Sequence, residues 1–177
     1  MKITAIIGSL RPDSIHRHIF NEYKEMNKDL FELEEASYAG LPVYDGVEES
    51  HPVADEMQQK ILNSDGIIVL TPEYNYSVPG GLKNAIDWIS RCDPQPMSGK
   101  PSTIIGASPG NAGTARMQYH LRQIGVFMNL HFMNKPEAMI AQSFSKVEDG
   151  VITDESTRKF LRRHAEAFTE FVNSSNG

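Results

Sequence analysis

The 177-residue sequence contains a single cysteine, Cys92, which excludes an internal disulfide framework and a zinc site built from cysteines. No apolar run approaches the roughly 20 residues that cross a bilayer, and the N-terminal segment lacks the length of a secretory signal peptide. Basic residues are in the minority, and the net charge of −6 opposes non-specific binding to nucleic acid, which requires neutralisation of phosphates. These absences predict a cytoplasmic protein with no membrane span, no nucleic-acid partner and no bound metal.

Length and composition indicate an ordinary globular chain, with 40% hydrophobic and 23% charged residues. A domain usually occupies roughly 100–200 residues, so residues 1–177 are predicted to form one domain with its own core. The sequence has no internal repeats, and its only low-complexity stretch is the polar tail at 173–177.

Apolar runs alternate along the chain with segments whose apolar residues recur at helical spacing. Strands are predicted at residues 2–7, 30–36, 66–71, 102–108 and 126–132, and residues 138–141 extend or flank the last of them. Helices are predicted at 15–27 and 54–62, from the residue after Pro79 to about Arg91, around 117–124 and after Thr153, with a loop at 37–50. This alternation predicts an α/β fold in which helices cover both faces of a parallel sheet.

The last helix carries clear signals of its start and of its buried face. Thr153 is the candidate N-cap, and the acidic Asp154 and Glu155 oppose the positive end of the helix dipole. His164 lies within the apolar stripe and is interpreted as a packed or boundary histidine and not as a ligand.

The loop at residues 8–14 joins the first strand to the first helix and contains Gly8, Ser9, Arg11 and Ser14. Glycine allows a close turn, and hydroxyls and helix N-terminal amides donate hydrogen bonds. Arginine adds a positively charged guanidinium that can donate two hydrogen bonds at once, so the loop suits a phosphate. The loop is neither G-x-G-x-x-G nor a Walker A sequence, which favours a terminal monophosphate over a pyrophosphate or triphosphate. The alternative is a capped helix start, with Asp13 or Ser14 as the cap and Arg11 in solvent.

A second loop, at residues 71–81, follows the buried strand 66–71 and is fixed by prolines and glycines. Its backbone amides can therefore point outward at a planar polar ligand instead of into the sheet. Tyr74 and Tyr76 flank such a ligand in one interpretation and make subunit contacts in the other.

The second loop and the helix after it closely resemble the hallmark segment of the NADPH-dependent FMN reductase family. The matching run is Pro72-Glu73-Tyr74-Asn75-Tyr76-Ser77-Val78-Pro79-Gly80-Gly81-Leu82-Lys83-Asn84-Ala85-Ile86-Asp87-Trp88. The first loop resembles the family's Gly-Ser-x-Arg-x-x-Ser phosphate loop, and a third loop, at residues 108–116, resembles its second flavin-contact loop. The resemblance covers essentially the whole chain. It departs from the family at His16, where asparagine is common, and at Gly113-Thr114, where a Gly-Gly pair is frequent.

This resemblance implies a flavodoxin-like three-layer α/β/α sandwich with a five-stranded parallel sheet and bound FMN. The FMN phosphate is expected on Ser9, Arg11 and Ser14, with His16 as a weaker candidate. The flavin ring is expected between the second and third loops, where preorganised amides would stabilise charge on its reduced form. The candidate residues there are Pro72, Glu73, Tyr74, Asn75, Ser108, Gly110, Asn111 and Gly113. No catalytic side chain is expected, because the cofactor carries the chemistry.

The resemblance also implies an NAD(P)H oxidoreductase that passes hydride from NADPH or NADH through bound FMN to a small-molecule electron acceptor. The acceptors it implies are quinones, azo dyes, flavins and metal ions such as chromate, and one open flavin face predicts ping-pong kinetics. A homodimer or homotetramer is expected, with Tyr74, Tyr76, Val78 and Trp88 beside a subunit contact. A flavodoxin-type electron carrier and a flavin-based redox-sensing module are the alternatives.

Overall fold

Eight strands, five α-helices and one 3-10 turn make up the part of the chain that the structure, a computed structural model, describes: residues 1–48 and 50–176. The strands are β1 Lys2–Ile7, β2 Glu32–Glu35, β3 Gly66–Thr71, β4 Pro101–Ala107, β5 His131–Phe132, β6 Ala138–Ile140, β7 Val147–Glu148 and β8 Val151–Ile152. The helices are α1 Ile15–Met26, α2 Pro52–Leu62, α3 Gly80–Ile89, α4 Ala115–Phe127, the turn η1 Ser143–Ser145 and α5 Glu155–Asn176. Residues 49 and 177, which fall in the expected loop and polar tail, lie outside the described residues. None of the described helices combines the length and apolar character that a membrane span requires.

The main sheet has the strand order β2-β1-β3-β4-β5, and its pairs are parallel. Two short strands share the fifth position, because β5 pairs with the start of β4 and β6 pairs with its end. The order reverses between β1 and β3, as it does in flavodoxin-like folds, which bind ligands outside the carboxyl ends of the strands beside this switch point. The predicted α/β sandwich on a parallel sheet of five positions is confirmed.

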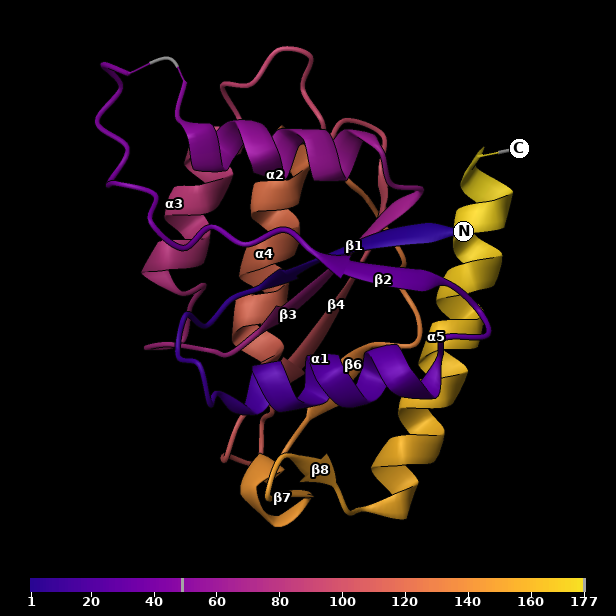
Figure 1. The fold of residues 1–177 in the computed structure, drawn as a ribbon. Helices are drawn as coiled ribbons and strands as arrows, with labels where there is room; N and C mark the ends of the chain where they lie inside the picture. The colour runs from indigo at the N-terminus through magenta and orange to yellow at the C-terminus, as the bar shows by residue number, and fades with distance from the viewer. Residues whose placement is uncertain (49, 177) are drawn as a thin grey trace.

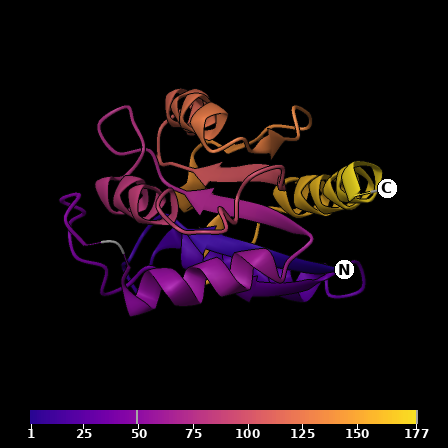
Figure 2. The ribbon, with the colours of Figure 1, turned by 90° about the horizontal axis from the view of Figure 1, so that it is seen from above.

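Helices cover both faces of the sheet, with α1 and α2 on opposite sides (Figure 1). α1 and α5 pack over Ile3, Ile68 and Ile105, whereas α2, α3 and α4 pack over Ile67 and Ile104 on the other face. Seen from above, α2 lies over the β1 side of the sheet and α4 over the β4 side (Figure 2). Since both faces of β3 are covered, all six of its residues are buried, which explains its nearly continuous apolar sequence.

The prediction of a strand over residues 126–132 is wrong in its first half. α4 continues through Val126 and Phe127, and only His131 and Phe132 pair with β4. Val126 and Phe127 are 80% and 76% exposed, so these apolar side chains stand on the outer face of a helix. A short apolar run does not distinguish a strand from part of a helix, and here the helix continued.

α5 begins one residue later than the sequence indicated. Asp154, and not Thr153, provides the cap, because its Oδ1 accepts the N–H of Thr157 at 2.7 Å. Hydrogen bonds from the hydroxyls of Thr157 and Ser156 to the same carboxylate hold the pKa of Asp154 at about 2.

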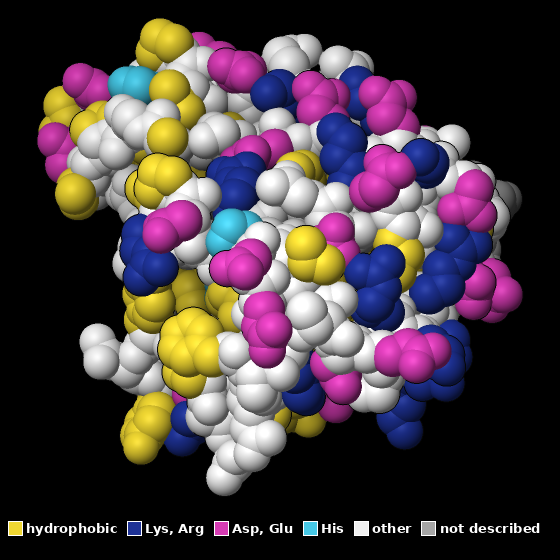
Figure 3. Space-filling model, turned by 60° about the horizontal axis from the view of Figure 1, so that its bottom comes forward, with side chains coloured by type: hydrophobic (Ala, Val, Ile, Leu, Met, Phe, Trp, Pro, Cys, Tyr) yellow, Lys and Arg dark blue, Asp and Glu magenta, His cyan; other side chains and the backbone are white. Residues whose placement is uncertain are grey.

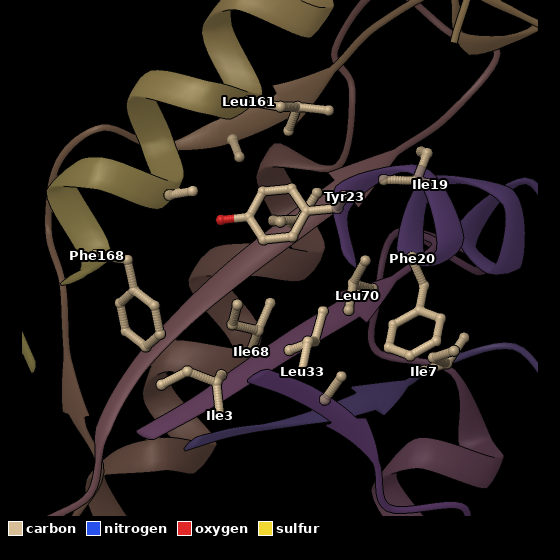
Figure 4. Packing of buried hydrophobic residues seen from close by; sticks show 14 of the residues in the cluster. Ile3, Ile7, Ile19, Phe20, Tyr23, Leu33, Ile68, Leu70, Leu161 and Phe168 are labelled. Atoms are coloured by element: carbon tan, nitrogen blue, oxygen red, sulfur yellow. The ribbon is translucent and has the colours of Figure 1, made fainter. Parts of the chain in front are cut away.

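His164 of α5 is a packed core histidine, one of the two alternatives that the sequence offered. Its Nδ1 lies 3.0 Å from the hydroxyl oxygen of Tyr23, and its Nε2 lies 3.0 Å from the hydroxyl oxygen of Thr103. Figure 4 shows the ring of Tyr23 reaching from α1 toward α5, close to Leu161. Complete burial lowers the pKa of His164 to about 4, so the ring is neutral at physiological pH.

Candidate functional site

Loops from neighbouring strands converge on one pocket at the carboxyl edge of the sheet. The pocket encloses about 300 Å³ and is bordered by the loops after β1, β3 and β4 and by η1 after β6. We call it the carboxyl-edge pocket, and its lining residues are Ser9, Arg11, Ser14, Ile15, His16, Pro72, Glu73, Tyr74, Ala107, Ser108, Pro109, Ser143 and Phe144. On the face in Figure 3, hydrophobic side chains gather on the left, the side on which β1 ends in Figure 1, whereas both charges are spread over the right.

Ser14 both caps α1 and lines the carboxyl-edge pocket, so the two interpretations of the first loop are compatible. Its Oγ accepts the N–H of Arg17 at 3.2 Å, which leaves its own O–H as a donor. Ser9 is buried beside it, and its Oγ accepts the N–H of Arg11 at 3.4 Å. The Arg11 side chain is 72% exposed and its Nε lies 3.4 Å from a carboxylate oxygen of Asp13, so its charge stands at the rim. The first amides of α1 point outward at the same place, as at any helix N-terminus.

Two glycines bring backbone segments close together beneath the pocket. Gly8 donates its N–H to the carbonyl of Leu70 at 2.7 Å, and a Cβ at Gly8 would collide with the side chain of Thr71. Near the end of β4, a Cβ at Gly106 would collide with the side chain of Thr114. Glycine is needed at both positions for close approach.

His16 lies at the pocket with its ring hydrogen-bonded to the end of β4. The residue is 2% exposed, and its Nε2 accepts the N–H of Ala107 at 3.2 Å. Burial lowers the pKa of His16 to about 4, although the neighbouring backbone groups of Thr71 and Ala107 oppose that shift. The ring is therefore neutral at physiological pH.

Asn75 and Tyr76 form a two-residue turn in the second loop with a positive φ at both residues, 49° and 67°. Tyr74 and Ser77 exchange backbone hydrogen bonds of 3.0 and 2.9 Å across it. This is a type I′ turn, and its left-handed backbone is strained at a tyrosine. It projects Tyr76, 70% exposed, with the guanidinium of Arg116 3.8 Å from the centre of its ring. Asn75 stands at the turn and does not line the carboxyl-edge pocket.

Glu73 fastens the second loop to the start of α4. One carboxylate oxygen lies 2.6 Å from the Nε of Arg116, and the other accepts the N–H of Met117 at 3.1 Å. The sequence suggested only a backbone role for Glu73. In this chain Arg116 contacts Glu73 and Tyr76 of its own second loop.

The third loop is held by its own backbone and by Gln142. The hydroxyl of Ser108 donates to the carbonyl of Gly113, where φ is 58°. Gln142 donates its N–H to the carbonyl of Gly110 at 3.1 Å and its Nε2–H to Oδ1 of Asn111 at 3.0 Å. Of these candidates Ser108 lines the pocket, whereas Gly110, Asn111 and Gly113 lie outside its lining.

η1 contributes two lining residues that the sequence analysis missed. Ser143 is fully buried, and its Oγ has no hydrogen-bond partner among the described residues. Phe144 is 71% exposed, although the turn is fixed by a 3.0 Å hydrogen bond from the N–H of Ser143 to the carbonyl of Ser108. The only sequence signal was an aromatic residue in a polar segment after an uncertain strand.

Trp88 is buried within its own chain. It is 2% exposed, its Nε1–H donates to the carbonyl of Pro42 at 2.9 Å, and the rings of Tyr44 and His51 contact it. Val78 is also only 9% exposed, so neither side chain needs a subunit contact to be buried, unlike the apolar patch that the sequence suggested.

A larger hollow of about 600 Å³ lies beside the start of α2 and the end of α3. Its lining residues are Tyr44, Gly46, Glu48, Ser50, Asp55, Gln58, Arg91, Cys92 and Asp93. None of the predicted site residues is among them. The carboxyl-edge pocket is smaller, but it lies at the switch point of the sheet and is the candidate site.

Strand order and pocket together define a flavodoxin-like protein that has hydrogen-bond donors suited to a phosphate at the carboxyl edge of its sheet. A family model described as NADPH-dependent FMN reductase matches residues 1–145. The chain belongs to this family.

Relatives match along almost the whole chain. A quinone reductase of Escherichia coli (strain K12) is 41% identical over 179 residues, which cover 97% of this chain and 95% of that protein. An NAD(P)H-dependent FMN reductase of Pseudomonas aeruginosa is 38% identical over 183 residues, which cover 100% of this chain and 98% of that protein. The solved structure of FerB, a flavoenzyme NAD(P)H:(acceptor) oxidoreductase from Paracoccus denitrificans, superposes with a TM-score of 0.88 at 32% identity, covering 98% of each chain.

The residues of the carboxyl-edge pocket fit FMN. The hydroxyls of Ser9 and Ser14, the guanidinium of Arg11 and the first amides of α1 suit a phosphate at one side. The unpartnered Oγ of Ser143 is a buried polar atom at the same pocket, of the kind that a ligand or water satisfies. A volume of about 300 Å³ falls at the lower end of the range for small-molecule sites.

Proposed function

We propose that this protein is an FMN-dependent NAD(P)H oxidoreductase of low acceptor specificity, which reduces quinones and also flavin, azo and metal-ion acceptors. The observation that carries the proposal is a pocket at the switch point of a flavodoxin-like sheet. In this pocket, hydrogen-bond donors suited to a phosphate lie opposite the second and third loops. FMN, when bound, supplies the two-electron chemistry, so the chain needs no catalytic side chain.

The chain's residues have two proposed tasks. Ser9, Arg11 and Ser14 bind the phosphate, and the backbones of Pro72, Glu73, Tyr74, Asn75, Ser108, Gly110, Asn111 and Gly113 hold the flavin ring. The ion pair of Glu73 with Arg116 and the hydrogen bonds of Gln142 support the second task, because they fix both loops before any ligand arrives. Asn75, Gly110, Asn111 and Gly113 stand beyond the pocket lining and are proposed to contact the outer edge of the ring.

The donor and the acceptor are proposed to occupy the open side of the carboxyl-edge pocket in turn. This arrangement supports the ping-pong kinetics expected from the family resemblance. It also supports low acceptor specificity, because the exposed side chains at that side, Tyr74 and Phe144, offer aromatic surface without a fixed polar pattern.

We also propose a cytoplasmic homodimer or homotetramer. The single cysteine supports a reducing compartment, where disulfides do not contribute to stability. Exposed aromatic side chains support a subunit contact, with Tyr74 at 49%, Tyr76 at 70% and Tyr119 at 61%. Sedimentation velocity tests the assembly, and a monomer that is fully active at micromolar concentration would contradict it.

Anaerobic mixing of the FMN-loaded protein with NADPH, followed at the flavin absorption band, tests the proposed activity. An oxidoreductase bleaches rapidly with no added reductase, and parallel runs with NADH give the nucleotide preference. An electron carrier or a redox-sensing module stays oxidised until a reductase is supplied, and that result would overturn the proposal. A steady-state panel of quinone, azo, ferric and chromate acceptors then ranks the acceptors.

A further inference from the structure

Ser143 brings a buried hydroxyl without a partner to the carboxyl-edge pocket. The residue lines this pocket and is fully buried, and its Oγ has no hydrogen-bond partner among the described residues. A buried hydroxyl without a partner is costly, so native proteins almost always satisfy it. Because Ser143 lies at the pocket, we expect the missing partner to come from a molecule that occupies it.

The other serines that line the pocket already take part in hydrogen bonds within the chain. The hydroxyl of Ser108 donates to the carbonyl of Gly113, inside the third loop. The Oγ atoms of Ser9 and Ser14 accept backbone N–H groups of the first loop and of α1. The hydroxyl of Ser143 therefore stands apart from the other three as the one that the described residues leave unused.

The turn that carries Ser143 is fixed without any ligand. The N–H of Ser143 donates to the carbonyl of Ser108 at 3.0 Å, and its own carbonyl accepts the N–H of Lys146 at 3.2 Å. Gln142 has a φ of 52°, a left-handed backbone that a hydrogen bond from its N–H to the carbonyl of Gly110 helps to maintain. The buried hydroxyl is therefore held on a backbone that does not have to rearrange to place it.

Ser143 lies where the first loop's side of the pocket meets the start of the third loop. His16, the second residue of α1, accepts the N–H of Ala107 at its Nε2, so the start of α1 lies beside the end of β4. The third loop begins at the next residue, Ser108, whose carbonyl binds the N–H of Ser143. The proposed function assigns the phosphate to the first loop and the ring to the second and third, so the ribityl chain that joins them has to pass this junction.

We propose that the hydroxyl of Ser143 binds the ribityl chain of the flavin, and not its phosphate or its ring. The inference rests on the proposed function. Ribityl carries hydroxyl groups that donate and accept as a serine hydroxyl does, so one hydrogen bond satisfies both partners. The phosphate has the donors of Ser9, Arg11 and Ser14, and the ring is expected to meet backbone amides of the second and third loops.

The test compares the affinities of the apoprotein for FMN, for riboflavin and for a flavin that carries a pentyl chain in place of ribityl, measured by quenching of flavin fluorescence. Ser143→Ala removes only the hydroxyl and should weaken FMN and riboflavin by the same factor, about threefold to tenfold. The pentyl flavin has no chain hydroxyl, so it should bind the variant as tightly as it binds wild type.

Ser145→Ala is the matched control in the same turn. The hydroxyl of Ser145 donates to the carbonyl of Gln142 at 2.9 Å, and the residue does not line the pocket. The control should leave the affinities for all the flavins unchanged. Losses in Ser145→Ala as large as those in Ser143→Ala would show that the turn matters and not the buried hydroxyl, which contradicts the proposal.

Three further results would overturn the proposal. A loss in Ser143→Ala that spares riboflavin would make Ser143 a phosphate ligand, and an equal loss for the pentyl flavin would assign its effect to the ring. Unchanged affinity for every flavin would show that the hydroxyl does not contact the cofactor. Wild-type protein that binds neither FMN nor riboflavin would overturn the proposed function itself, which separates the two failures.

Discussion

Glu73 and Arg116 form an ion pair in which the carboxylate is buried and the guanidinium is half exposed. The Glu73 side chain is 5% exposed and that of Arg116 is 49% exposed. The same carboxylate also accepts the N–H of Met117 at 3.1 Å, at the start of α4. The link between the second loop and α4 therefore depends more on Glu73 than on its partner.

Glu73→Ala should lower the free energy of unfolding by about 1–3 kcal/mol, because it leaves the Met117 amide without its charged acceptor. Arg116→Ala should lower it by less than about 1 kcal/mol, since water screens a half-exposed charge. Urea unfolding followed by circular dichroism measures both, with the exposed Arg163 of α5 replaced by alanine as control. Equal losses for Glu73 and Arg116 would show that the ion pair, and not the amide contact, holds the loop.

Arg11→Ala should weaken FMN binding by about 1.5–3 kcal/mol, the usual range for a hydrogen bond to a charged group, and leave riboflavin binding unchanged. The reason is that Arg11 stands at the rim beside Ser9 and Ser14 and has only Asp13 as an ionic partner among the described residues. Fluorescence titration measures both affinities. A variant that binds FMN as tightly as wild type would place the guanidinium in solvent.

The apoprotein should lose stability in mild acid because of two buried histidines. His16 and His164 both have a pKa of about 4 in the folded chain, below the ordinary value of 6.5. Between these values only the unfolded chain binds the protons. Stabilisation that is complete above pH 6.5 is therefore lost as the pH falls toward 4, by about 1.4 kcal/mol per histidine for each unit.

Urea unfolding at several pH values across this window measures the slope, and His164→Gln should reduce it by about half. The hydrogen bonds of His164 to Tyr23 and Thr103 make this variant less stable at neutral pH as well. The slope, and not the absolute stability, is therefore the quantity to compare. A slope that is unchanged in His164→Gln would show that other groups dominate the acid response.

Ser143→Ala should leave the apoprotein as stable as wild type or stabilise it by about 1 kcal/mol. The reason is that the buried Oγ has no partner among the described residues, and an unsatisfied hydroxyl is costly to bury. Thermal unfolding of the apoprotein measures the effect, and Ser102→Ala is the control, because that buried hydroxyl donates to the carbonyl of Lys100. A destabilised Ser143→Ala would mean that the hydroxyl is already satisfied, for instance by an ordered water.

Initial rates at several acceptor concentrations should give parallel double-reciprocal lines, with each substrate inhibiting competitively against the other at high concentration. This pattern follows if nicotinamide and acceptor use one open side of the carboxyl-edge pocket in turn. Phe144→Ala, which removes an exposed ring from that side, should change the Michaelis constants of bulky acceptors more than those of small ones. Intersecting lines would instead indicate separate sites for donor and acceptor.

The order of elements could be predicted because most of the apolar runs are buried. β3 is the clearest case, since it is covered on both faces and its sequence is apolar up to Thr71. Val126 and Phe127 were mispredicted because they are apolar and yet exposed on a helix, and Trp88 was mispredicted because its hydrogen-bond partner, the carbonyl of Pro42, is 46 residues away. Local sequence carries no record of such long-range contacts.

The residues of the candidate site also fall into those that the sequence revealed and those that it did not. The first loop could be found because its serines and arginine are adjacent in sequence and their chemistry is local. The role of His16 could not, because its acceptor nitrogen meets Ala107, 91 residues away. Ser143 and Phe144 were missed for a related reason: they reach the pocket through the pairing of β6 with β4, which the sequence left uncertain.

The close backbone approach at Gly8 and Gly106 has a consequence for directed evolution of this protein. Any side chain at Gly8 collides with Thr71, and any side chain at Gly106 collides with Thr114. A library that varies these two positions therefore consists mostly of variants that cannot pack. Tyr74 and Phe144 border the same pocket and are exposed, so they accept new side chains with little loss of stability. Selection for a new electron acceptor should therefore vary the exposed residues at the edge of the pocket and keep Gly8 and Gly106 unchanged.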